Sequence, residues 1–92
     1  MGMPILMVTK KPMVGPKIPI TSNRKVLKVE GIQAGDLIHI RAYGGERGYL
    51  ELLTLDGSGN SFDLNLKGWT YLQAELVKAA KPVSIWLEDS DG

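Results

Sequence analysis

Hydrophobic and polar residues alternate with a period of two through most of residues 24–88. Three short apolar runs at 37–43, 49–55 and 62–66 are separated by the sequences GGERG and DGSGN. Glycine allows the positive φ angles of tight turns, and Asp and Asn side chains hydrogen-bond to nearby backbone there. Alternating runs with such turns between them predict consecutive antiparallel strands joined by hairpins, which is a β-meander.

The alternation also predicts which side chains face the core, because successive residues of a strand point to opposite faces. The run 49–55 (YLELLTL) is apolar on both faces, which is typical of a central strand in a packed sandwich. A last strand is expected at 83–88. The side chains expected to point inward, or to share one face of their strand, are Leu27, Val29, Ile38, Ile40, Ala42, Phe62, Leu64, Leu66, Val83, Ile85 and Leu87.

Residues 69–80 fit two patterns. The sequence YLQAELVKAAK is rich in helix-forming residues, and Leu72 and Leu76 are separated by about one helical turn. As a strand, the segment places Leu72, Ala74 and Leu76 on one face and Tyr71 on the other. The neighbouring strands and the short connection to PVSIWLE favour the strand.

Residues 1–22 contain four prolines, which remove backbone donors and disfavour a helix. Short extended segments at Ile5–Thr9 and Lys17–Ile20 fit either edge strands or an arm lying on a partner. We therefore expect an extended N-terminal arm at 1–22 and a β-sandwich domain at 23–92. About seven or eight short strands in one small domain predict an all-β fold, a small antiparallel two-sheet β-sandwich of the jelly-roll or Ig-like type.

Composition and charge narrow the class of protein. The 92 residues include no cysteine, so disulfides and thiolate metal sites are excluded, and association is the remaining way to supplement a small core. No apolar run approaches the roughly 18 residues of a membrane span. The N-terminal order of apolar residues before lysines is the reverse of a secretory signal. We expect a protein made in the cytoplasm, without membrane attachment.

Basic residues are concentrated at the N-terminus. Residues 1–28 carry six basic residues and no acidic one, whereas residues 29–92 carry five basic residues and all ten acidic ones. The lysines of the arm, among them Lys10, Lys11 and Lys17, are either solvated or complementary to an acidic partner surface. Nucleic acid is a less favoured partner, because a pI near 8.0 lacks the basic footprint that it requires.

No motif indicates an enzyme, a cofactor or a metal site. His39 is the only histidine, and no nucleophile lies in a recognisable elbow. The GGERG loop is followed by a strand, whereas a phosphate-binding loop leads into a helix. The DGSGN loop lacks the alternate acids and the distant Glu of a calcium-binding EF-hand loop. We expect both loops to be hairpin turns, and we expect no catalytic residue.

Two aromatic residues are expected to point away from the core, Tyr71 and Trp86. Exposed aromatic rings serve as sugar-stacking platforms or as protein interfaces, and they also cover the open end of a sandwich. With the lysines of the arm, the candidate partner-binding residues are Lys10, Lys11, Lys17, Tyr71 and Trp86.

The rhythm of residues 24–88 resembles that of small bacteriophage virion proteins encoded among the capsid and tail genes. These are all-β domains thought to act as decoration or fibre-base components. The segments that carry the resemblance are VLKV at 26–29, GDLIHI at 35–40, LELLTLDGSG at 50–59, FDLNL at 62–66, YLQAEL at 71–76 and PVSIWL at 82–87.

The resemblance implies a non-enzymatic structural protein of the virion, which binds and stabilises a phage capsid as a decoration (cement) protein. Its partner would be the major capsid protein or another virion protein, with many copies in a homo-oligomer or a symmetric array. On this hypothesis the arm adds a strand to the shell protein, so removal of residues 1–22 would abolish attachment and leave the sandwich folded. The alternatives are a carbohydrate- or receptor-binding module that uses Tyr71 and Trp86, and a tail or baseplate adaptor.

Overall fold

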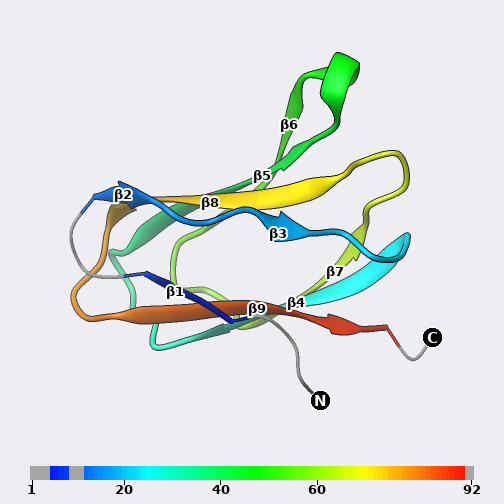
Figure 1. Ribbon diagram of the computed structural model, residues 1–92. Helices are drawn as coiled ribbons and strands as arrows, with labels where there is room; N and C mark the ends of the chain where they lie inside the picture. Colours follow the sequence, from blue (N-terminus) through cyan, green and yellow to red (C-terminus); the bar gives the residue numbers. More distant parts are fainter. Residues whose placement is uncertain (1–4, 9–11, 91–92) are drawn as a thin grey trace.

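The protein consists of two antiparallel β-sheets packed face to face (Figure 1). This computed structural model describes residues 5–8 and 12–90. A three-residue 3-10 turn, η1 (Gly45–Arg47), connects the fifth and sixth strands. The strands are β1 (Ile5–Val8), β2 (Met13–Val14), β3 (Ile18–Pro19), β4 (Arg24–Glu30), β5 (Leu37–Tyr43), β6 (Tyr49–Leu55), β7 (Ser61–Asn65), β8 (Tyr71–Lys78) and β9 (Val83–Asp89).

The order of the strands is that of a jelly roll. One sheet has the order β1-β9-β4-β7, and the other has the order β2-β8-β5-β6, with β3 also paired to β8. If β2 and β3 are counted as one position along β8, the strands pair from the ends of the chain inward, first with last and second with second-last. This folded-over pairing defines the jelly roll, one of the two sandwich types predicted.

The predicted β-meander is wrong. Among the described strands, β5 and β6 are the one pair of consecutive strands that also lie next to each other. The DGSGN loop leads from β6 in one sheet to β7 in the other, so it is a crossover and not a hairpin. The Asp56 side chain accepts hydrogen bonds from both the amide and the hydroxyl of Ser58 in this turn. Such turn chemistry reverses the chain equally well within a sheet or between sheets.

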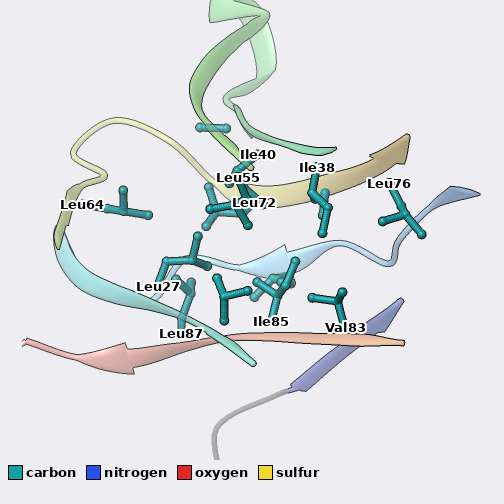
Figure 2. Close-up of a cluster of buried hydrophobic side chains, with 14 of the residues drawn as sticks. Leu27, Ile38, Ile40, Leu55, Leu64, Leu72, Leu76, Val83, Ile85 and Leu87 are labelled. Carbon is teal, nitrogen blue, oxygen red and sulfur yellow. The ribbon is translucent and has the colours of Figure 1, made fainter. Parts of the chain in front are cut away.

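The core lies between the two sheets (Figure 2). The inward faces predicted from alternation are buried on β4, β5 and β9. Leu64 is buried on β7, and Leu66 is buried directly after that strand. Phe62 is half-buried against the same core. Residues 71–78 form β8, as predicted, with Leu72, Ala74 and Leu76 buried. The strand pattern prevails there because all three side chains contribute to one continuous core.

The described part of the N-terminal segment belongs to the sandwich rather than lying free of it. Strand β1 pairs with β9, and β2 and β3 pair with β8. The amide of Gly15 donates to the carbonyl of Ala74 at 2.9 Å, the amide of Ile20 donates to Thr70 at 2.9 Å, and Ile18 is buried. The segment therefore supplies edge strands to both sheets. Of the two predicted alternatives, edge strands or an arm lying on a partner, the described residues show the first.

One buried lysine lies on the inward face of β4. Lys25 is 5% exposed, and its Nζ contacts Oδ1 of Asp89 on β9 at 2.5 Å. The hydrogen bond and the charge of Lys25 lower the pKa of Asp89 from its ordinary value of 3.8. Because the folded-state pKa is lower than the unfolded one, the pair stabilises the fold above pH 3.8. That stabilisation is lost as the pH falls through the folded-state pKa.

We expect Asp89→Asn to lower the free energy of unfolding above pH 3.8 and to flatten its acid dependence below that value. Urea unfolding across this pH range measures both effects. A double-mutant cycle with Lys25→Met is the control, because removing either partner removes the interaction. An unchanged acid dependence in Asp89→Asn would show that other carboxylates are responsible for it.

Candidate binding surface on the β5–β6 hairpin

The hairpin formed by β5 and β6 projects from the sandwich (Figure 1). Among the described strands, β6 pairs with β5 alone, so it is an edge strand. The prediction of a central strand at 49–55 is therefore wrong. Tyr49 is 62% exposed and Leu50 is 47% exposed, because this end of the hairpin extends beyond the packed layers. The apolar residues at the start of β6, Tyr49 and Leu50, are therefore exposed surface, whereas Leu55 at its end is buried in the core.

A β-bulge divides β6 into a packed half and a projecting half. Ile40 pairs with Leu53, but Arg41 pairs with Glu51, so Leu52 is an extra residue in the ladder. Leu52 and Leu53 pack against the core, whereas Tyr49 and Leu50 lie beyond it. Bulges bend a strand and increase its twist, and this one lies where the hairpin leaves the sandwich.

Three tyrosines form a row across the outer face of this sheet. The register pairs Tyr43 on β5 with Tyr49 on β6 and with Tyr71 on β8. The Tyr43 and Tyr71 rings are stacked with centroids 5.0 Å apart, and the Tyr43 and Tyr49 rings are tilted with centroids 5.6 Å apart. Cross-strand aromatic pairs of this kind stabilise a sheet by about 0.5–1.5 kcal/mol each beyond their burial. The row ends at Lys17, whose Nζ lies 4.9 Å from the Tyr71 centroid.

A charged network lies next to the tyrosine row. Arg41 Nη1 contacts Glu75 at 2.7 Å, and its Nε donates to Glu51 at 3.4 Å. His39 Nδ1 contacts Glu51 at 2.6 Å and lies 3.2 Å from the Thr54 hydroxyl. The hydrogen bond that Arg41 donates to the Glu75 carboxylate raises the pKa of Arg41 above its ordinary value. The network pairs the one acidic residue of β6 and leaves an edge of low net charge.

The turn end of the hairpin is braced by residues 67–70. The Arg47 guanidinium lies 4.1 Å from the Trp69 ring, a cation–π contact. The amide and the hydroxyl of Thr70 both donate to the Tyr43 carbonyl at 2.8 Å. A Cβ added at Gly44 would lie 2.9 Å from the Trp69 ring, so glycine permits this close approach. These contacts hold the projecting hairpin in a defined position, which lowers the entropy cost of binding.

The structure brings together two of the residues predicted to bind a partner and separates a third. Lys17 and Tyr71 are in contact on the outer face of the β8 sheet. Trp86 lies on the outer face of the opposite sheet, where its Nε1 donates to Glu88 at 2.9 Å. Tyr71 and Trp86 therefore face away from each other and form no shared platform. Lys10 and Lys11 lie outside the described residues.

Sequence reasoning missed Tyr49 and Leu50 as surface residues. A signal was present, because a run that is apolar on both faces fits an exposed edge as well as a central strand. Within residues 5–8 and 12–90, no three His, Asp or Glu side chains come together in a way that could hold a metal ion. In the same part of the chain, no helix has the length and hydrophobicity needed to cross a membrane.

Protein-family models, curated proteins and solved structures were each compared with this chain, and none of them matches it.

Proposed function

We propose that this chain is a non-enzymatic structural protein of a bacteriophage virion, and that it attaches to the major capsid protein or another virion protein through β6. The observation that carries the proposal is the edge position of β6 together with the exposure of Tyr49 and Leu50. A decoration (cement) protein needs an adhesive surface rather than a reactive site.

Strand β6 is the least protected edge of the sandwich. Natural edges are protected by short length, prolines, charged side chains or β-bulges. Strand β1 has four residues, β2 and β3 have two each, and β7 carries Asp63 in its centre. Strand β6 has seven residues and no proline, and its single charged residue is paired with Arg41. Its bulge at Leu52 leaves the exposed segment of Tyr49 and Leu50 uninterrupted. Such an edge is suited to adding a strand from a partner, with main-chain hydrogen bonds providing affinity.

The edge strand replaces the N-terminal arm as the proposed attachment site. The described N-terminal strands are paired with β8 and β9 of this molecule, so they do not form a free arm that could add to a partner. The jelly roll occurs in viral capsid and lectin domains, so the fold supports a virion role and a sugar-binding role alike. The resemblance of residues 24–88 to phage virion proteins favours the first. A symmetric array of copies on the particle would add many small interfaces into one stable attachment.

Leu50→Lys is expected to weaken attachment, because a lysine on the edge opposes strand addition. The measurement is co-sedimentation of the purified chain with intact and empty capsids of the phage that encodes it. We expect saturable binding by the wild type and a loss of at least about tenfold in the variant, equivalent to roughly 1.4 kcal/mol.

Val14→Lys is the matched control, since Val14 is 58% exposed and lies on β2 at the opposite edge of the same sheet. It should bind as the wild type does. Equal binding by both variants would contradict attachment through β6. Binding confined to tail fractions would assign the chain to the tail or baseplate instead of the capsid.

A further inference from the structure

A second surface lies on the opposite face of the molecule, around Trp86. An open hollow of about 350 Å³ is present on the outer face of the β4–β9 sheet. It is separate from the tyrosine row, which lies on the outer face of the other sheet. The residues that line it are Lys28, Val29, Glu30, Asn60, Trp86 and Glu88.

The strand register brings the polar groups around the indole. Lys28 on β4 is directly opposite Trp86 on β9. Glu30 and Glu88 each lie two residues along their own strands, so the two carboxylates flank the Lys28–Trp86 pair on opposite sides. Asn60 closes the hollow beside β4, where its carbonyl accepts a hydrogen bond from the Val29 amide at 3.0 Å. Strands therefore hold four of the five polar or aromatic side chains.

We infer that this hollow is a binding site for a neutral saccharide. A pyranose ring has an apolar face of C–H groups and a rim of hydroxyls. The half-buried Trp86 indole offers an apolar surface on which the C–H face of the sugar can stack. The hydrogen bond from Nε1 to Glu88 at 2.9 Å holds the indole in its orientation. The Lys28 ammonium, the Asn60 amide and the two carboxylates offer donors and acceptors for the sugar hydroxyls. The hollow thus combines one aromatic ring with four polar or charged side chains that can fix the orientation of a polar ligand.

The charges select among saccharides. The lining has one basic residue and two acidic residues, so its formal charge is negative. A negative lining opposes sialic and uronic acids, whose carboxylates would lie near Glu30 and Glu88. Neutral hexoses therefore fit the site better than acidic sugars. This site does not depend on attachment through β6, because the hollow and the β6 edge belong to different sheets and share no residue.

The test is an array of neutral and acidic oligosaccharides, followed by titration of the best neutral glycan into Trp69→Phe. In that variant Trp86 is the one remaining tryptophan, so its fluorescence reports on the hollow. We expect a saturable change in fluorescence and an affinity equal to that of the wild type by calorimetry. Trp86→Ala is expected to lose binding at least tenfold.

Glu30→Ala is the second variant, because Glu30 is exposed and its removal leaves the core intact. It should also weaken binding, which keeps the test valid if Trp86→Ala fails to fold. No binding to any neutral glycan would overturn the inference, as would wild-type affinity in both variants. Preference for acidic sugars would overturn the assignment of ligand class.

Discussion

Removal of residues 1–22 is expected to unfold most of the protein, rather than to release a folded sandwich. The deletion removes β1 from the edge of one sheet and β2 and β3 from the edge of the other. It also removes the buried side chain of Ile18 and the backbone hydrogen bonds from Gly15 to Ala74 and from Ile20 to Thr70. In jelly-roll terms, two of eight strand positions are lost, and β8 and β9 become unprotected edges.

The expected loss is a large part of the total stability. Each lost hydrogen bond costs about 1 kcal/mol, and loss of a buried Ile side chain costs about 2–5 kcal/mol. Since small domains have total stabilities of about 5–15 kcal/mol, the truncated chain should be mostly unfolded or aggregated at 25 °C. Circular dichroism and urea unfolding of the truncated chain and of the full chain measure the effect.

Two point variants locate the origin of this loss. Ile18→Ala should be destabilised by about 2–5 kcal/mol, because it leaves a cavity in the core. Val14→Ala should change stability by less than about 0.5 kcal/mol, because Val14 is mostly exposed on the neighbouring strand β2. A truncated chain with the stability of the wild type would mean that residues 1–22 are an independent arm, and attachment through that arm would again become the favoured hypothesis.

Gly57→Ala is expected to be the most destabilising of the glycine substitutions in the turns. Gly57 lies in the crossover between β6 and β7, with φ of +93°. A Cβ there would lie 2.6 Å from the carbonyl carbon and oxygen of Gln33 and 2.7 Å from the amide of Ala34. Because these are backbone atoms, the turn or the β4–β5 loop must move. A left-handed residue costs about 1–2 kcal/mol and overpacking costs about 1–3 kcal/mol, so the expected loss is roughly 2–5 kcal/mol.

Gly35→Ala separates the two contributions. Gly35 has nearly the same φ, +96°, but an added Cβ would have no neighbour within 4 Å. Gly35→Ala should therefore lower the free energy of unfolding by about 1–2 kcal/mol, which is the strain of a left-handed backbone alone. Urea unfolding of both variants gives the difference, which measures the close approach of the two loops. Equal losses in the two variants would contradict that contact.

The candidate sites depend on which strands are neighbours. The outward orientation of Tyr71 and Trp86 follows from alternation alone, because side chains on one strand face point the same way. The separation of Tyr71 from Trp86 does not follow from alternation, because the chain crosses from one sheet to the other between β8 and β9. The pairing of Lys28 with Trp86 joins residues that are far apart in sequence, and no local pattern indicates it.

The sequence by itself determined the all-β class, the strands at 24–88 and the inward faces of β4, β5, β8 and β9. These features are local, because each follows from a period-two pattern of apolar residues that must be buried together. The tertiary structure alone decided the strand order, the integration of the N-terminal strands and the edge position of β6. Those features depend on main-chain pairing between distant segments. The main-chain groups of all residues except proline are alike, so the sequence does not indicate which strands will pair.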